Sequence, residues 1–99
     1  MTSHFTRRLA SVDREVCALA TELTQLREQL AVHEEALEES RLRLLVAETP
    51  VADRDHQRTF DAYRGVEEGV LRLEQKLGEL RDERRRLERA ISSRPTVAS

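Results

Sequence analysis

Apolar residues recur at alternating intervals of four and three positions over the first third of the chain. The ladder consists of Phe5, Leu9, Val12, Val16, Leu19, Leu23, Leu26, Leu30, His33 and Leu37, of which His33 alone is polar. This spacing is the heptad pattern of a coiled coil, in which the apolar stripe of one helix packs against the stripe of another. The sequence therefore predicts a long helix that begins near Phe5 and needs a partner helix. Its N-cap is Thr2, Ser3 or Thr6, of which Ser3 fits a start near Phe5.

A second heptad ladder later in the same chain supplies that partner. Its core positions are His56, Thr59, Tyr63, Val66, Val70, Leu73, Leu77, Leu80, Arg84, Leu87 and Ile91. The two ladders are out of phase by five residues, which a single kinked coiled coil does not accommodate. Between them lies Thr49-Pro50, a good N-cap followed by a residue suited to the first helical turn. The second helix therefore starts at Pro50 or, with Asp53 as its cap, a few residues later.

These ladders predict an all-α fold in which two long helices form an antiparallel coiled-coil hairpin. We expect a single domain over residues 1–99, with helices over about 5–48 and 53–92, a turn over about 48–53 and a frayed tail over 94–99. A short connection makes consecutive helices antiparallel neighbours. Two registers align the ladders, with paired residue numbers that sum to either 96 or 103. The first turns tightly at Glu48 and the second turns at Val51, where Pro50 fits better, so we slightly prefer the second.

The half of the hairpin nearest the turn has a poorer seam and a surplus of apolar surface. Four seam positions there are polar, namely His33, Ser40, His56 and Thr59, so we expect looser packing than in the rest of the hairpin. Apolar residues also lie off the seam, and an exposed apolar patch usually marks an interface. The predicted interface consists of Leu42, Leu45, Val46, Phe60 and Leu71. We expect a homodimer with a four-helix arrangement, and the alternative is a local register shift that turns these residues inward.

Two glycines, Gly65 and Gly69, form a G-x-x-x-G pattern in the second helix. A glycine in a helix interior lowers helix stability by about 1 kcal/mol relative to alanine, so each glycine there either serves the packing or is a tolerated cost. One interpretation is the close approach of another helix. The other interpretation, which we slightly favour, is a tolerated weakness.

The titratable residues do not form a pattern typical of catalysis or metal binding. Cys17 is the only cysteine, and the three histidines (His4, His33 and His56) are far apart in the sequence. No pair of them has the spacing of zinc ligands, and a two-helix hairpin offers no cleft. We therefore expect no enzyme activity, no cofactor and no metal.

Charge and hydropathy also limit the partners of the chain. The net charge is −2, and the arginines between Arg81 and Arg89 are interleaved with acids, which argues against nucleic-acid binding. No apolar run approaches the roughly 20 residues that span a bilayer, so we expect no membrane association. The first residues are polar and lack the apolar core of a signal peptide, which favours a cytoplasmic location.

The expected turn is acidic, with Glu48, Asp53 and Asp55 around it. A slender hairpin with carboxylates at its tip resembles the N-terminal finger of bacterial Gre-type transcript-cleavage factors. In that family, tip carboxylates enter the secondary channel of RNA polymerase and help to hold a catalytic magnesium ion. The resemblance implies that Asp53 and Asp55 are the matching residues. The family motif G-D-x-x-E-N-A-E-Y is not present, and His56 stands where its second acid belongs.

The sequence thus favours a non-enzymatic coiled-coil interaction or scaffold module. Its expected partners are a second copy of itself and a further, unidentified protein. The alternative is a regulator of RNA polymerase that acts through the acidic hairpin tip.

Overall fold

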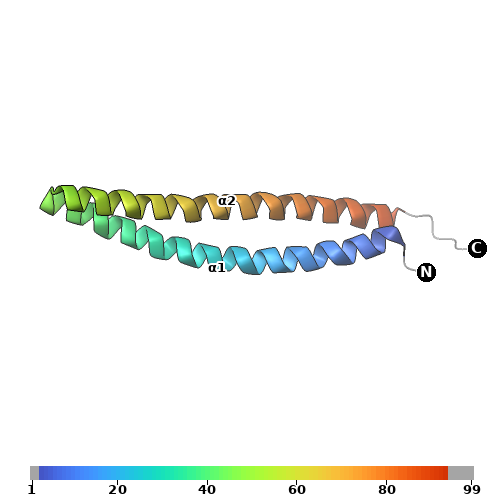
Figure 1. The fold of residues 1–99 in the computed structure, drawn as a ribbon. Coiled ribbons are helices and arrows are strands. Elements are labelled where there is room, and N and C mark those ends of the chain that lie inside the picture. The colour runs from blue at the N-terminus through green and yellow to red at the C-terminus, as the bar shows by residue number, and fades with distance from the viewer. Residues whose placement is uncertain (1–2, 94–99) are drawn as a thin grey trace, which may run out of the picture.

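A computed structural model describes residues 3–93 of the chain and shows a helical hairpin. Helix α1 spans His4–Ala47 and helix α2 spans Pro50–Ser92. The two helices run side by side in opposite directions, so the start of α1 and the end of α2 lie together, far from the turn (Figure 1). Each helix is about 65 Å long at about 1.5 Å per residue. The predicted antiparallel hairpin is confirmed.

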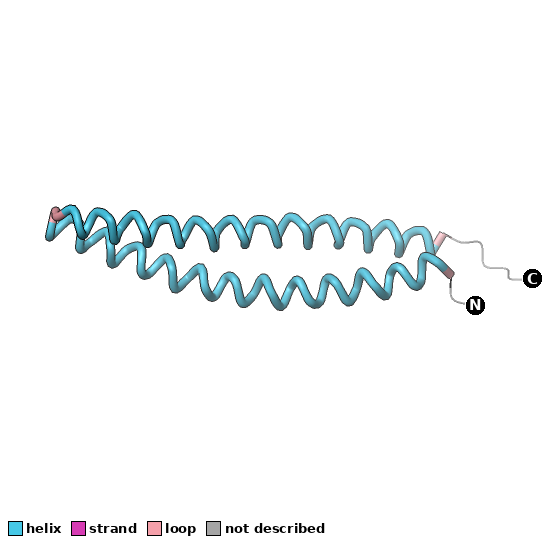
Figure 2. Tube along the Cα trace, in the orientation of Figure 1, coloured by secondary structure: helices cyan, strands magenta, loops and turns pink. Residues whose placement is uncertain are grey.

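The turn between the helices is only two residues long (Figure 2). Glu48 adopts a left-handed conformation, with a φ of 47°, and its N–H donates to the carbonyl oxygen of Leu44 at 3.0 Å, which closes α1. Thr49 then caps α2, because its hydroxyl accepts a hydrogen bond from the backbone N–H of Ala52 at 3.1 Å. Pro50 is the first residue of α2. Both the later start near 53 and the longer turn over 48–53 are therefore wrong.

The N-terminus of α1 is capped as its sequence predicts. The hydroxyl of Ser3 accepts a hydrogen bond from the backbone N–H of Thr6 at 3.1 Å. This bond satisfies one of the amides that the first turn of a helix leaves without a partner.

Contacts across the hairpin correspond to the register in which paired residue numbers sum to about 96. The Oγ atom of Ser40 lies 2.9 Å from Nδ1 of His56. Near the other end, Nε of Arg84 lies 3.1 Å from a carboxylate oxygen of Asp13. The preference for the register with sum 103 is therefore wrong. The reason is the left-handed Glu48, which reverses the chain at once and leaves Pro50 inside α2 rather than in a wider loop.

The apolar core lies in the part of the hairpin away from the turn. We call residues 9–30 and 66–91 the stem, and residues 33–63 the tip half. Among the described residues, every buried apolar side chain belongs to the stem: Val12, Leu23, Val70, Leu77, Leu80 and Leu87. In the tip half, only Ser40 is buried. The tip half therefore has the less apolar packing, as its polar seam predicts.

Two exceptional stem residues are explained by their surroundings. Arg84 occupies a core position of the heptad, but its side chain is exposed and reaches Asp13 and Glu88. Gly69 lies against α1, and a Cβ atom added there would lie 3.0 Å from Cδ2 of Leu26. At Gly65, by contrast, an added Cβ atom would meet open space. Only Gly69 is thus needed for close packing within the hairpin.

An ion pair between Arg8 and Glu83 joins the two helices at the end of the stem. The guanidinium of Arg8 donates to both carboxylate oxygens of Glu83, at 2.6 and 3.0 Å. These hydrogen bonds lower the pKa of Glu83 below its usual value. A carboxylate with a lowered pKa in the folded state stabilises the fold at neutral pH, and this contribution is lost as the pH falls through that pKa.

Within residues 3–93, neither helix contains an apolar stretch long enough to cross a membrane.

Candidate functional site

An apolar groove lies beside the turn, on one side of the seam. It has a volume of about 440 Å³, and α1 and α2 both contribute to it. Its apolar side chains include Leu42, Val46 and Val51, which are 50%, 88% and 59% exposed. Arg43 and Asp55 lie at the same groove and carry opposite charges. Large apolar side chains with this exposure are costly to leave in water, so the groove is the main candidate for an interaction site.

A second groove lies on the other side of the turn. Its volume is also about 440 Å³, and its lining includes Leu44, Leu45 and Pro50. Two acids, Glu48 and Asp53, also line it. Leu45 is 62% exposed there. The second groove is therefore more acidic than the first and offers less apolar surface.

The five predicted interface residues do not gather on one surface. Leu42 and Val46 line the first groove, whereas Leu45 lines the second. Phe60 is 37% exposed, and the guanidinium of Arg64 lies 5.9 Å from the centre of its ring. Leu71 is exposed but belongs to the stem, about 30 Å from the turn at about 1.5 Å per residue.

The sequence interpretation missed Val51 as a surface residue. Val51 was assigned to the turn, because the second helix was expected to begin near Asp53. With Pro50 as the first helical residue, the side chain of Val51 belongs to α2 and completes the groove opposite Val46. The signal was the pair Thr49-Pro50, a cap followed by a preferred first residue, which fixes the helix start.

The predicted acidic tip is divided between the two grooves. Glu48 and Asp53 line the second groove, and Asp55 lines the first. Within residues 3–93, no group of three or more His, Cys, Asp or Glu side chains is placed to hold a metal ion. The acids of the tip therefore do not form one cluster.

Two polar seam residues of the tip half, Ser40 and His56, form a hydrogen-bonded pair. The hydroxyl of Ser40 donates to the carbonyl oxygen of Leu37 at 2.9 Å, and Nδ1 of His56 lies 2.9 Å from the same hydroxyl. Since a hydroxyl carries only one proton, Nδ1 of His56 is the donor in the second bond. Thr59 donates to the carbonyl oxygen of Asp55 at 2.8 Å. Among the described residues, no buried side-chain nitrogen or oxygen lacks a partner. We therefore assign Ser40 and His56 a structural role in holding the register.

Comparisons of this chain with protein-family models, curated proteins and solved structures found no match. The functional argument consequently rests on the groove, the exposed apolar side chains and the charges of the tip half. The resemblance of the acidic tip to Gre-type fingers stays a prediction from the sequence.

Proposed function

We propose that this chain is a non-enzymatic, cytoplasmic coiled-coil interaction module that binds a second copy of itself through the tip half. The observation that carries the proposal is the first groove, in which Val46 is 88% exposed beside Leu42 and Val51. Monomeric soluble proteins rarely leave a contiguous apolar patch of this kind in water unless it serves an interaction.

The architecture supports a partner that covers this side of the hairpin. Two helices share only one interface, and that interface buries apolar side chains in the stem but not in the tip half. A second hairpin would cover the groove with another groove of the same composition, which is how an isologous dimer forms. The result is a four-helix arrangement over the tip half, with the second groove left free for a further protein partner.

We expect Val46→Glu to convert the dimer into a monomer. The substitution places a charge in the groove, where burial against a second copy would remove it from water without a partner. The matched control is Leu71→Glu, which introduces the same charge at another exposed apolar residue, far from the groove. Sedimentation equilibrium over a concentration series measures the mass of both variants and of the wild-type chain.

The wild-type chain and Leu71→Glu should both approach twice the chain mass of 11.4 kDa, whereas Val46→Glu should remain near 11.4 kDa. Circular dichroism should show equal helix content in all three proteins, because both substituted side chains are exposed. A dimer that survives Val46→Glu but is lost with Leu71→Glu would place the interface on the stem and contradict the proposal.

A further inference from the structure

A stripe of small, apolar and charged residues follows one side of α1 from Val32 to Val46, close to the turn. Its members recur at intervals of four and three residues, so they share one side of the helix: Val32, Ala36, Glu39, Arg43 and Val46. Val32 is 64% exposed and Val46 is 88% exposed. Arg43 and Val46 line the first groove, which places the stripe on the groove side of the seam.

Helix α2 carries a matching stripe on the same side of the seam. Its members have the same spacing: Val51, Asp55, Arg58, Ala62 and Gly65. Val51 and Asp55 line the first groove together with the α1 stripe, so the two stripes form one surface, which we call the tip face. At Gly65 an added Cβ atom would meet nothing within 4 Å, so this part of the tip face is open to an approaching helix.

The charged side chains of the tip face are unpaired within the part of the chain that the structure describes. Among the described residues, the side chains of Glu39, Arg43, Asp55 and Arg58 make no ion pair or hydrogen bond. Several charges outside the tip face are paired, among them Arg41 with Glu38 at 2.8 Å and Arg27 with Glu74 at 3.1 Å. The tip face thus combines exposed apolar side chains with four charges that a partner is able to pair.

Building on the proposed self-association, we infer that two hairpins pair in parallel through their tip faces, with both turns at the same end. A two-fold axis along the hairpin preserves the level of each residue and exchanges the two helices. Helix α1 of each copy therefore lies over α2 of the other. The position of each residue along the hairpin axis follows from the register, in which residues whose numbers sum to about 96 lie opposite each other.

This arrangement pairs unlike charges and places uncharged residues over each other on either side of them. Arg43 of one copy lies over Asp55 of the other, and Glu39 lies over Arg58. Nearer the turn, Val46 of one copy meets Val51 of the other. Towards the stem, Val32 of one copy meets Gly65 of the other, where the open space above the glycine receives it. Because the contact is isologous, every pair occurs twice in the dimer.

The area of the contact is that of a specific but modest interface. The tip face continues towards the stem through the uncharged Gln29 and Gln25, which gives it a length of about 30 Å at about 1.5 Å per residue. Two packed helices are about 20 Å wide, so each copy contributes about 600 Å² and the pair about 1,200 Å², the lower end of the range for specific complexes. We expect a reversible dimer.

An antiparallel pairing across the turns covers less surface. In this pairing the two-fold axis is perpendicular to the hairpin at the level of Arg41. Helix α1 of one copy then lies over α1 of the other, and α2 lies over α2. Unlike charges of the tip face again meet. The overlap then ends at both turns and is only about 20 Å long, which gives about 800 Å² for the pair. This area lies in the range of non-specific crystal contacts, so the parallel arrangement is favoured.

The decisive experiment mixes two charge-reversal variants, Arg43→Glu and Asp55→Arg. Alone, each variant places like charges over each other at two symmetry-related contacts and should raise the dissociation constant by about tenfold or more. In the mixed dimer of an equal mixture, the two introduced charges meet at one contact and the native Arg43 and Asp55 meet at the other, so unlike charges face each other at both contacts. The mixture should therefore regain the wild-type dissociation constant, as measured by sedimentation equilibrium.

The mixing experiment separates the geometry from the self-association itself. In the antiparallel pairing, the mixed dimer keeps like-charge contacts, so the mixture would remain as weak as the single variants. That outcome, with a dimeric wild-type chain, would overturn the parallel arrangement and leave the proposed function standing. A wild-type chain that stays at 11.4 kDa over the whole concentration series would overturn both.

Discussion

Leu77→Ala is expected to lower the free energy of unfolding by about 2–5 kcal/mol, because it removes a buried side chain from the stem and leaves a cavity. Leu77 is 4% exposed and packs in one cluster with Leu23 and Val70. The chain has few other buried apolar residues to compensate for the loss. Urea denaturation followed by circular dichroism at fixed protein concentration measures the change.

The matched control for this substitution is Leu71→Ala. Leu71 lies on the same helix, two turns from Leu77, but it is 57% exposed. Its truncation should change the free energy of unfolding by less than about 0.5 kcal/mol. Equal effects of the two substitutions would mean that Leu71 is buried as deeply as Leu77, and the described seam would be wrong.

Substitutions of the polar pair in the tip half should have opposite effects, depending on whether one or both partners are replaced. Ser40→Ala removes a buried hydroxyl and leaves Nδ1 of the half-buried His56 without its hydrogen-bond partner, which should lower the free energy of unfolding by about 1–3 kcal/mol. Replacing both residues, as in Ser40→Leu with His56→Leu, should raise it by about 1–4 kcal/mol, because apolar side chains then fill the seam.

The double substitution should also weaken the choice of register. In the register with sum 103, Ser40 faces Tyr63 rather than His56, so the observed pair favours the register with sum 96. Once leucine fills both positions, the seam no longer penalises a slip by one heptad. Denaturation of the single and double variants tests the stabilities. A single Ser40→Ala variant more stable than the wild-type chain would contradict the structural role of the pair.

The heptad ladders were enough to predict the hairpin, because a stripe such as Leu9 to Leu30 is buried only by a second stripe. They were not enough to predict the register, since both alignments place apolar residues opposite each other. The register depends on the backbone at Glu48, which adopts a left-handed conformation although it is not glycine. Glutamate has no strong preference for this conformation, so the tight turn could not be predicted from the residue type at position 48.

The candidate site was only partly predictable for a similar reason. All five predicted interface residues lie off the seam and are exposed, while their role as an interface stays a prediction. Their division between two sides of the hairpin depends on the register and on the start of α2. An early helix start brings Val51 into the groove, whereas Leu71 lies too far along α2 to join it.

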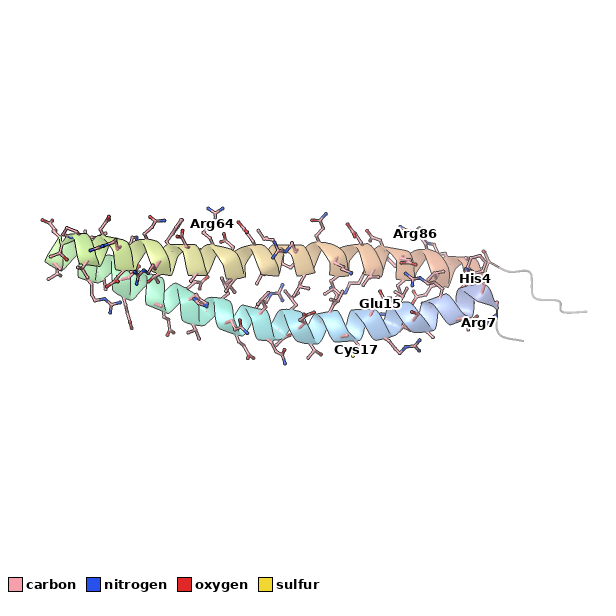
Figure 3. All side chains as sticks on the ribbon, viewed as in Figure 1. His4, Arg7, Glu15, Cys17, Arg64 and Arg86 are labelled. Atoms are coloured by element: carbon pink, nitrogen blue, oxygen red, sulfur yellow. The ribbon has the colours of Figure 1, made fainter. Side chains whose placement is uncertain are left out.

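The parallel dimer predicts a short distance between the two copies of Cys17. This residue is the only cysteine, it is exposed, and it lies on the side of α1 turned away from α2 (Figure 3). A nitroxide label on the wild-type chain therefore needs no substitution. In the parallel dimer the two α1 helices lie diagonally across the bundle, with axes about 14 Å apart, so the labels should be about 30 Å apart.

The most direct test of the account is thus the distance between the labels at Cys17, measured by pulsed electron paramagnetic resonance. The parallel dimer should give one population at about 30 Å that disappears when labelled chain is diluted with excess unlabelled chain. A distance of roughly 70 Å would indicate antiparallel pairing, because Cys17 then lies about 36 Å from the two-fold axis in each copy. The absence of any dipolar coupling at concentrations where the wild-type chain is expected to pair would contradict self-association.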